Sequence, residues 1–311
     1  MIVCCGEALI DFIPVGDGLL YRPIEGGSPY NIALGLGRLG VATAFVGGLS
    51  TDGFGGRLAD KLEANGVDLD WAARLDAPTT LAMVTLRGGQ AAYTFYDEAT
   101  AARNWTRAAL PALPDTVSAL HFGSISLLRN PSADAFCDLM LARRGQAVLT
   151  LDPNIRPALI DDPDAVRGRI RRMAAAADIV KISDEDLDWL AQGQDLREAA
   201  EGFLDNGPAF VVITGGAEGA EAFYKNGSVR VAAPKVDVVD TVGAGDSFMA
   251  ALLARISETG RMSRDRLDET DEAGLKDLLG FAVQAAALTC TRPGADPPRR
   301  EEIGPSVEVT L

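Results

Sequence analysis

The chain has 311 residues, of which 47% are apolar and 23% charged, and this composition excludes fibrous and intrinsically disordered proteins. Its formal net charge of −15 disfavours general binding to nucleic acids or anionic membranes, because both need a positive protein surface. No apolar run reaches the roughly 18 residues of a membrane span, and the N-terminal segment lacks the basic start of a signal peptide. We therefore expect a cytoplasmic protein without nucleic-acid or membrane partners.

The cysteines and the single histidine carry no metal-binding pattern. The four cysteines are scattered without a CxxC pair, so the sequence predicts buried, reduced thiols. His121 lies in an apolar run with no second His or Cys nearby, and we expect it to be a strand residue rather than a metal ligand.

In chain order, short apolar runs alternate with amphipathic segments. The apolar runs cover residues 1–6, 42–50, 118–126, 146–154, 178–183 and 209–216. The helical patterns cover residues 55–66, 132–145, 164–177 and 184–192. Continuous β-rich runs spaced by amphipathic helices indicate a parallel sheet with helices on both faces. The predicted fold is therefore α/β, a doubly wound and mostly parallel sheet in one domain that spans 1–311.

Residues 79–98 break this rhythm, because two runs of alternating polarity flank the turn sequence RGGQ. The pattern predicts a β-hairpin. Together with IDFIPV near the start of the chain, the hairpin predicts a small second sheet. We expect this sheet, built from about 11–25 and 79–103, to be a lid over the strand ends.

Three glycine-rich segments are candidates for a phosphate site. The first, GLGRLG at 35–40, matches the dinucleotide fingerprint, but a turn precedes it where that fingerprint needs a strand. Ile32, Leu36 and Leu39 have helical spacing, so we place these glycines inside a helix, at about 1 kcal/mol each relative to alanine. Close packing against another element would explain them.

The second segment, ITGGAEGAEAFY at 213–224, follows a buried strand. A tight turn into a hairpin explains its glycines. The backbone exposed near Thr214, Gly216 and Gly219 also suits a nucleotide, and the sequence leaves both interpretations open.

The third segment, VVDTVGAGDSFMAALLARI at 238–256, is the strongest candidate. A helix that starts near Gly245 leaves the N–H groups of 243–246 unpaired, and the missing side chains let an anion approach them. These groups and the helix dipole form an anion site. Asp246 is then either a helix-capping acid or a base that deprotonates a hydroxyl during phosphoryl transfer. The order acid, small loop, acid, helix favours the base.

Several motifs resemble one enzyme family. DTVGAGDSF at 240–248 resembles the C-terminal signature of the ribokinase-like, PfkB-type carbohydrate kinases, and GGSPYNIALGLGRLG at 26–40 resembles their N-terminal signature. GEALIDF, DPNIRP, KISDED, ITGGAEG and TRPGA extend the resemblance over nearly the whole chain, and DPNIRP and TRPGA look most like the fructokinase branch. The resemblance implies a ribokinase-like fold and an enzyme that uses ATP and Mg²⁺ to convert D-fructose to fructose 6-phosphate.

The same resemblance implies roles for individual residues. Asp246 would be the base, and the amides of Gly243, Ala244 and Gly245 would form the anion hole, with Arg156 near the phosphates. The sugar would contact Asp11, Gly26, Gly27, Asn31, Tyr96 and Arg103. The nucleotide would contact Asn154, Lys181, Ser183, Thr214, Gly216 and Gly219. Asp186 would hold Mg²⁺ through water, and Asp240, with carbonyls near Thr289 and Gly294, matches the monovalent-cation site of some relatives, which makes K⁺ a further candidate.

Departures from the family pattern keep alternatives open. Ser183 and Asp186 stand where relatives often carry Asn or Glu, and Val283 stands where they often carry an Asn beside the nucleotide. An arginine in the lid that faced the sugar would favour an acidic substrate, so a 2-keto-3-deoxygluconate kinase that uses Arg103 or Arg87 is the closest alternative. A surface role is the other interpretation of Arg103. A non-catalytic sugar- or nucleotide-binding regulator is the alternative class, and the lid edge is a candidate homodimer surface.

Overall fold

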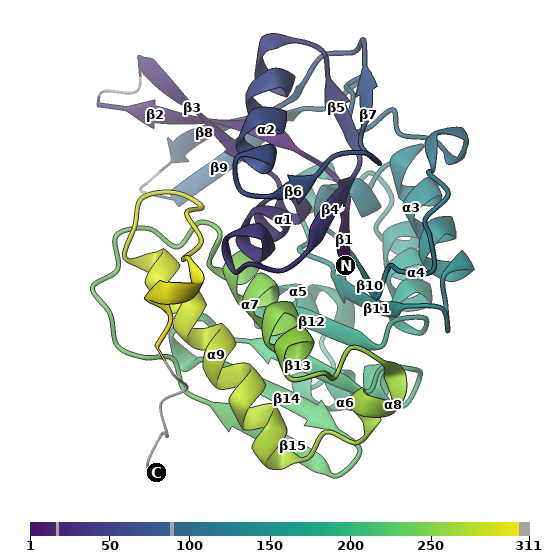
Figure 1. Ribbon diagram of the computed structural model, residues 1–311. Coiled ribbons are helices and arrows are strands. Elements are labelled where there is room, and N and C mark those ends of the chain that lie inside the picture. Colours follow the sequence, from purple (N-terminus) through teal and green to yellow (C-terminus); the bar gives the residue numbers. More distant parts are fainter. Residues whose placement is uncertain (17–18, 88–89, 305–311) are drawn as a thin grey trace.

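The computed structural model describes residues 1–16, 19–87 and 90–304, without the side chains of 86, 87 and 90–92. Its body is a nine-stranded sheet with helices on both faces, and a four-stranded sheet projects from one end (Figure 1). The predicted doubly wound α/β fold with a small second sheet is therefore confirmed. Within the described part of the chain, no helix is both long and apolar enough to cross a membrane.

The large sheet is parallel except at one edge. In spatial order its strands are β15 (Gly227–Val231), β14 (Ala220–Tyr224), β13 (Phe210–Thr214), β12 (Ile179–Ser183), β11 (Val148–Asp152), β10 (Ala119–Gly123), β1 (Ile2–Cys5), β4 (Thr43–Val46) and β6 (Val67–Asp68). Within the described residues, the antiparallel pairs of this sheet are β13 with β14 and β14 with β15. From β1 the chain moves outward through β4 to β6 and then returns to β10 on the other side of β1. The strand order therefore reverses between the neighbouring strands β1 and β10. This is the topological switch point, and ligands bind in such sheets at the carboxyl ends of the strands there.

Helices cover both faces of this sheet and bury two apolar clusters against it. One face carries α1 (Ser28–Arg38), α7 (Ala244–Glu258) and α9 (Glu272–Cys290), and the other carries α3 (Ser132–Ala142), α4 (Pro163–Ala174), α5 (Asp184–Ala191) and α6 (Leu196–Leu204). The remaining helices are α2 (Gly53–Glu63) and α8 (Arg264–Asp268). Single 3₁₀ turns lie at η1 (Arg107–Ala109), η2 (Ser124–Leu127), η3 (Pro157–Leu159), η4 (Gly216–Glu218) and η5 (Arg300–Glu302).

The second sheet has the order β3 (Leu20–Gly26), β2 (Leu9–Val15), β8 (Thr80–Arg87) and β9 (Gln90–Tyr96). The predicted hairpin is β8 and β9, which pair antiparallel, and β2 joins it in parallel. The apolar run at 42–50 was wrongly predicted as one strand. It splits into β4 and β5 (Gly48–Ser50), which pairs with β7 (Ala73–Leu75) in a separate two-stranded sheet. The break is at Gly47, where an added Cβ would lie 2.2 Å from the Gly6 carbonyl oxygen.

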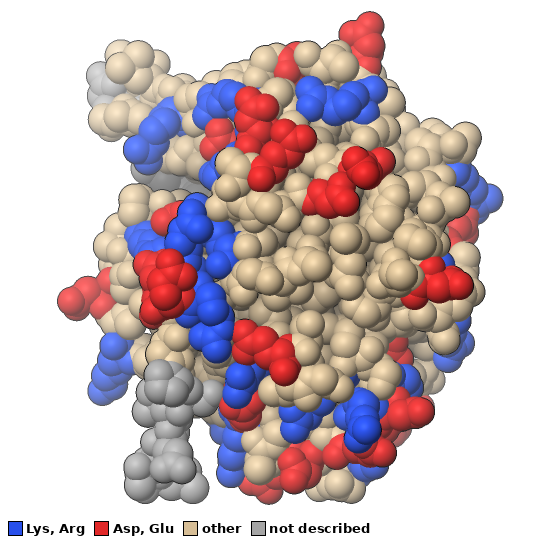
Figure 2. All heavy atoms as spheres, in the orientation of Figure 1, with Lys and Arg blue, Asp and Glu red and all other residues tan. Residues whose placement is uncertain are grey.

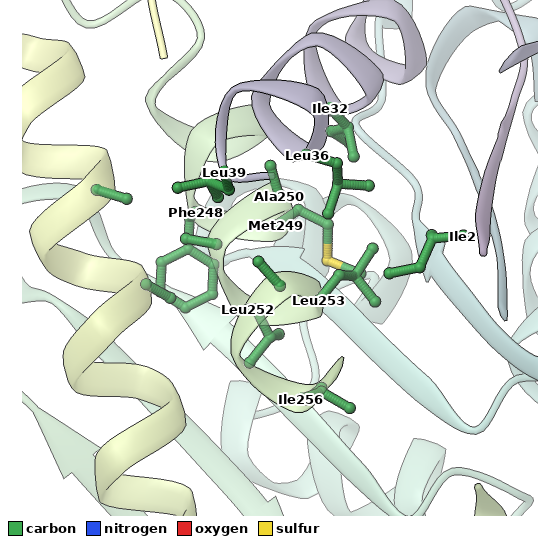
Figure 3. Packing of buried hydrophobic residues seen from close by; sticks show 14 of the residues in the cluster. Ile2, Ile32, Leu36, Leu39, Phe248, Met249, Ala250, Leu252, Leu253 and Ile256 are labelled. Atoms are coloured by element: carbon green, nitrogen blue, oxygen red, sulfur yellow. The ribbon is translucent and has the colours of Figure 1, made fainter. Parts of the chain in front are cut away.

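Helix α7 is buried on almost every side, since α1, α9 and the sheet enclose it. Phe248, Met249, Leu252, Leu253 and Ile256 are 3% exposed or less, and they pack against residues such as Ile32 and Leu36 of α1 (Figure 3). Burying such a side chain stabilises a fold by roughly 1.5–3 kcal/mol. This packing holds the N-terminus of α7 in one place.

The glycines of GLGRLG do not form a dinucleotide loop. Gly35 and Gly37 lie inside α1, and Gly40 follows the helix with φ of +77°. A Cβ added at Gly35 would lie 2.7 Å from the Ala250 Cβ, and one added at Gly37 would lie 2.3 Å from the Asn65 carbonyl oxygen. The predicted helix and its close packing are confirmed.

His121 and the cysteines are placed as predicted, with one difference. His121 is fully buried in β10, where burial lowers its pKa to about 3. All four cysteines are free thiols, and Cys290 is half-buried while the other three are buried.

On the face shown in Figure 2, basic and acidic side chains are interspersed, in spite of the net charge of −15.

The contact at Gly35 gives a test of the α1–α7 packing. Gly35→Ala should lower the free energy of unfolding by up to about 2 kcal/mol, because overpacking costs about 1–3 kcal/mol and the gain in helix propensity offsets about 1 kcal/mol of this. Gly168→Ala in α4 is the matched control, since an added Cβ there meets nothing within 4 Å. Urea unfolding should show the control to be more stable than wild type by up to about 1 kcal/mol. Equal stabilisation by both substitutions would contradict the packing argument.

Candidate active site

A cavity of about 310 Å³ lies at the carboxyl ends of β1, β10, β11 and β12, between the body and the second sheet. Its position is the topological switch point, and its size falls at the lower end of small-molecule sites, roughly 300–1,000 Å³. Nine predicted site residues line it: Asp11, Gly27, Asn31, Asn154, Arg156, Lys181, Gly243, Gly245 and Asp246. The fold therefore gathers residues from both ends of the chain around one space.

Asp246 lies in the first turn of α7 and is 9% exposed. Its Oδ1 accepts a hydrogen bond from the Ser28 hydroxyl at 2.6 Å, and its Oδ2 accepts one from the Asn31 Nδ2 at 2.8 Å. Burial raises the pKa of Asp246, and these two hydrogen bonds oppose the shift. The result is an oriented carboxylate that is a better proton acceptor than an ordinary aspartate.

Asn31 has spare bonding capacity next to this carboxylate. It lines the cavity, and its buried Oδ1 has no hydrogen-bond partner among the described residues. A buried polar atom without a partner costs about 1–3 kcal/mol unless something satisfies it. A ligand hydroxyl in the cavity would do so.

The loop before α7 has most of the donors that the sequence predicts. The helix begins at Ala244, and Gly243 precedes it in the left-handed region with φ of +76°. The Ala244 N–H donates to the Thr241 carbonyl at 3.2 Å, so the expectation that all four amides are unpaired was wrong for this one. The N–H groups of Gly243, Gly245 and Asp246 make no hydrogen bond to other described residues. Three donors are thus available to an anion.

The segment after α9 holds this loop from behind. Asp240 accepts hydrogen bonds from the N–H groups of Val242, at 3.0 Å, and Gly294, at 2.8 Å. An added Cβ at Gly243 would lie 2.6 Å from the Cβ of Ala295, so only glycine fits there. These two hydrogen bonds give Asp240 a structural role that needs no cation. K⁺ binding at this position stays a prediction.

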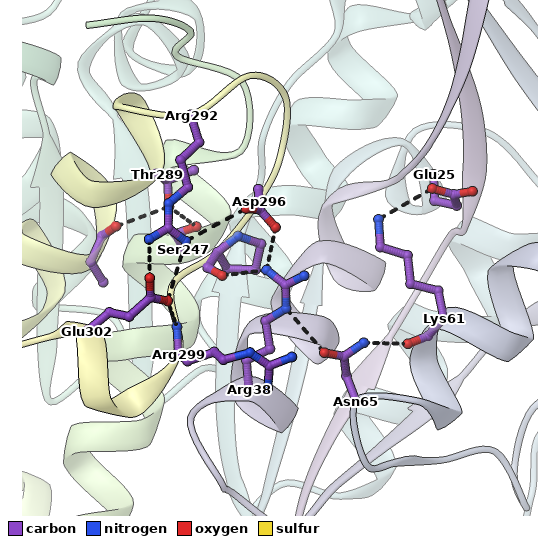
Figure 4. Close-up of polar contacts among 12 residues, drawn as sticks. Glu25, Arg38, Lys61, Asn65, Ser247, Thr289, Arg292, Asp296, Arg299 and Glu302 are labelled. Atoms are coloured by element: carbon purple, nitrogen blue, oxygen red, sulfur yellow. Dashed lines mark hydrogen bonds and ion pairs between the residues drawn. The ribbon is translucent and has the colours of Figure 1, made fainter. Parts of the chain in front are cut away.

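Polar contacts anchor the same segment to α1 and to η5 (Figure 4). The Arg38 Nη1 donates to Asp296 Oδ1 at 2.5 Å and to the Pro297 carbonyl at 2.6 Å. Arg292 pairs with Glu302 at 2.5 Å. The anion loop is therefore fixed by contacts outside the cavity.

Lys181 lies under the anion loop. Its Nζ is 2.7 Å from Asp152 Oδ2, and both side chains are buried. An added Cβ at Gly245 would lie 3.1 Å from the Lys181 Nζ. Asn154 lines the same part of the cavity with φ of +40°, a conformation rare outside glycine and typical of functional loops.

Ser183 and Asp186 lie at the start of α5, next to the cavity but not in its lining. Ser183 caps the helix by accepting the Asp186 N–H at 3.1 Å, and Asp186 accepts the Ile155 N–H at 3.2 Å. Burial raises the pKa of Asp186 to about 6, with a further contribution from Asp152. Within the described residues, no group of three or more His, Cys, Asp or Glu side chains is arranged to hold a metal ion.

The second sheet contributes Asp11, Tyr93 and Phe95 to the cavity. Tyr96, predicted to contact the sugar, is 59% exposed and lies outside the lining, because alternate side chains of a strand point to opposite faces. Gly26 lies under Asp11, where an added Cβ would be 2.3 Å from the Asp11 Oδ2. Burial raises the pKa of Asp11 to about 6, and Arg156 opposes this shift.

Arg103 also lies outside the cavity lining. It pairs with Asp97 at 3.5 Å and donates to the Asn130 carbonyl at 3.3 Å, and Arg129 pairs with the same aspartate. These contacts hold Arg103 away from the cavity lining, and its contact with the sugar stays a prediction. The Arg87 side chain lies outside the described residues.

The second glycine segment forms the turn between β13 and β14. Gly219 has φ of +91°, and an added Cβ there would lie 2.1 Å from the Val231 carbonyl oxygen, so the hairpin alone requires it. Thr214 and Gly216 lie outside the cavity lining, and contacts of these three residues with a nucleotide stay a prediction. Val283 is 5% exposed and belongs to the apolar core.

Several further residues line the cavity without having been predicted: Glu7, Ser28, Tyr93, Phe95, Ser124 and Asp152. Asp152 is the last residue of β11 and Glu7 lies two residues after β1, both in motifs already noted, so acids at strand ends were the available signal. Ser28 gave none, because its partner lies 218 positions away.

The comparisons with known proteins agree with this geometry. The profile of the pfkB family carbohydrate kinases matches residues 1–302. The chain belongs to this family. It is 45% identical to a fructokinase of Rhizobium leguminosarum bv. trifolii over 280 residues, which cover 89% of this chain and 86% of the relative. The expected carbohydrate kinase family is therefore confirmed.

Two solved structures show the same fold with ligands bound. A fructokinase from Xylella fastidiosa with bound ATP has a TM-score of 0.88 and 28% identity, with 94% of this chain and 93% of that chain covered. A fructokinase from Vibrio cholerae O395 with fructose, ADP and calcium bound has a TM-score of 0.84 and 29% identity, with 94% of each chain covered.

The raised pKa values give a test that is independent of activity. Asp11 and Asp186 have a pKa of about 6 in the folded chain, above the ordinary value of about 4 in the unfolded chain. Between these values the folded chain binds more protons, so these residues make the free energy of unfolding fall as pH rises. Asp186→Asn should therefore gain stability relative to wild type as pH increases across this interval. Urea unfolding at several pH values measures it, and a difference that does not change with pH would contradict the burial argument.

Proposed function

We propose that the protein is a fructokinase that transfers the γ-phosphoryl group of ATP to the 6-hydroxyl of D-fructose. The observation that carries the proposal is Asp246, held by Ser28 and Asn31 in the cavity lining. The N–H groups of Asp246 and of two neighbouring lining residues make no hydrogen bond to other described residues. A base and an anion site within one helical turn suit a reaction that removes a proton from a hydroxyl and gathers charge on phosphoryl oxygens.

The proposed reaction has one proton transfer and one phosphoryl transfer. Asp246 accepts the proton of the sugar hydroxyl, that oxygen forms a bond to the γ-phosphorus, and the bond to the bridging oxygen breaks to release ADP. The N–H groups of Gly243 and Gly245 donate to the transferred group, and Arg156 stabilises it as a planar donor. Sugar hydroxyls bond to Asp11 and to the free Oδ1 of Asn31. The second sheet covers the sugar and excludes water that would hydrolyse ATP.

The acids near Lys181 fit a hydrated Mg²⁺. Asp152 has a buried Oδ1 without a partner among the described residues, and Asp186 lies close enough for Asp152 to raise its pKa. Two carboxylates next to one lysine leave net negative charge, which suits Mg²⁺ held mainly by phosphates and water. Asp186 and Asp152 would hold Mg²⁺ through water, and the ion would offset the negative charge of the phosphates.

The charges around the cavity favour a neutral sugar over 2-keto-3-deoxygluconate. Among the described side chains, Arg156 and Lys181 are the cations in the lining, and each lies near a carboxylate, Asp11 and Asp152 respectively. Arg103 is paired with Asp97. No described cation is therefore left for a substrate carboxylate at the sugar end.

We also propose a cytoplasmic location and nucleotide contacts at Thr214, Gly216 and Gly219. A homodimer could form through the second sheet, where the apolar residues Leu20 and Tyr96 are exposed.

ATP consumption with Mg²⁺ tests the substrate. The panel is fructose, 2-keto-3-deoxygluconate, ribose, adenosine and no sugar, and we expect turnover with fructose well above the others. Turnover only with the keto acid would overturn the choice of sugar and place a cation at the lid. No turnover in spite of sugar binding would favour the regulator.

Asp246→Asn tests the base. The change keeps the two neighbours of the side chain but removes the proton acceptor, so kcat should fall by about 10²–10⁴-fold while sugar binding changes little. Steady-state kinetics and calorimetric titration with fructose measure the two quantities. Turnover at the wild-type rate would refute the mechanism.

A further inference from the structure

Glu7 lines the cavity, and the proposed mechanism gives it no role. It lies two residues after the end of β1, at the switch point, and is 2% exposed. Its Oε1 accepts the Ser28 N–H at 3.2 Å, and its Oε2 accepts the Ser126 N–H at 3.1 Å. One carboxylate thus joins the end of β1 to the start of α1 and to η2.

The start of α1 depends on this bond. Gly27 is the N-cap residue and has no side chain to accept an N–H, so an acceptor must come from another element. Glu7 supplies it at Ser28. The backbone of Gly27 lies close to Glu7, since an added Cβ at Gly27 would be 2.7 Å from the Glu7 carbonyl oxygen. The first turn of α1 is therefore fixed against the strand end.

The Ser28 hydroxyl is available for another partner. Gly27, and not Ser28, is the N-cap residue of α1, so this hydroxyl does not cap its own helix. It donates instead to Asp246 Oδ1 at 2.6 Å. The path from Glu7 to the carboxylate of Asp246 thus has two hydrogen bonds and one residue between them.

We infer that Glu7 is a positioning residue that fixes Ser28 so that its hydroxyl orients the carboxylate of Asp246. The inference rests on the proposed role of Asp246 as the base. A carboxylate suits this position because it can accept two N–H groups at once, one on each oxygen, whereas an amide side chain has one acceptor oxygen. No ion pair with Glu7 occurs among the described residues, so it is held by these neutral donors.

Glu7→Gln is the first variant. One N–H loses its acceptor, Ser28 becomes less well fixed, and kcat should fall about tenfold, or about 1.4 kcal/mol, while KM for fructose changes less. The Ser28 hydrogen bond lowers the pKa of Asp246, so weakening it should also move the acid limb of the kcat profile to higher pH. A loss of general stability alone would not shift this limb.

A double-mutant cycle with Ser28→Ala tests the path itself. If Glu7 acts through Ser28, adding Glu7→Gln to Ser28→Ala should change kcat by less than about twofold. An equal effect of Glu7→Gln in both backgrounds would overturn the inference. So would a rise in KM with unchanged kcat, which would indicate that Glu7 contacts the sugar directly.

Two controls separate the possible failures. Asp178→Asn changes a half-buried carboxylate that also accepts a main-chain N–H, from Leu149 at 2.8 Å. Because Leu149 lies at the end of β11 away from the cavity, this variant should leave the acid limb of the kcat profile unchanged. If Glu7→Gln does not fold, Glu7→Asp is used instead. Aspartate keeps both acceptor oxygens, but its side chain is shorter by one methylene, so its hydrogen bonds to the two N–H groups are weakened. It should therefore move the acid limb of the kcat profile in the same direction. If Asp246→Asn turns over at the wild-type rate, the proposed function is refuted. If Asp246→Asn is inactive but the effects of Glu7→Gln and Ser28→Ala are additive, only the role of Glu7 is refuted.

Discussion

The buried contact between α1 and the first turn of α7 is the interaction on which the site depends. Asp246 is a carboxylate in an apolar helix, and an ionised group there is tolerated only if hydrogen bonds replace its hydration. Ser28 and Asn31 provide those bonds from α1. Each hydrogen bond to a charged group contributes about 1.5–3 kcal/mol, so α1 and α7 cannot separate without leaving the charge unsatisfied.

The packing of the two helices follows from this constraint. Gly35 lets α1 approach Ala250 on α7, and the apolar residues of α7 fill the space between α1, α9 and the sheet. The segment after α9 then fixes the loop before α7 through Asp240 and Ala295. The anion loop itself is short and makes few bonds of its own. Its geometry is set by contacts with neighbouring elements, which is how a preorganised site avoids reorganisation during the reaction.

The sequence predicted the parts of this arrangement that local patterns encode. The alternation of strands and helices, the hairpin at 79–98, the helix that contains Gly35 and the GAGD loop all follow from spacing and residue type within a short window. The two signatures also brought Asn31 and Asp246 into one site, since the family pattern joins them.

The rest needs contacts between distant residues. The sequence does not say which face of β9 is turned to the cavity, so it does not distinguish Tyr96 from Tyr93 and Phe95. The pairing of Arg103 with Asp97 is a tertiary contact that no local pattern predicts. The run at 42–50 resembles one strand in sequence, because the reason for its break is the backbone of Gly6. Ser28 orients the Asp246 carboxylate only because α7 lies beside α1, and no local pattern encodes that neighbourhood.

The central claim is that the reactive hydroxyl lies between Asp246 and the anion loop. A crystal structure of Asp246→Asn with fructose and a non-hydrolysable ATP analogue tests it most directly. The account predicts the 6-hydroxyl within about 3 Å of the side chain at position 246, with the terminal phosphate over the N–H groups of Gly243 and Gly245. A sugar whose reactive hydroxyl instead faces Asp11, or a terminal phosphate away from that loop, would contradict it.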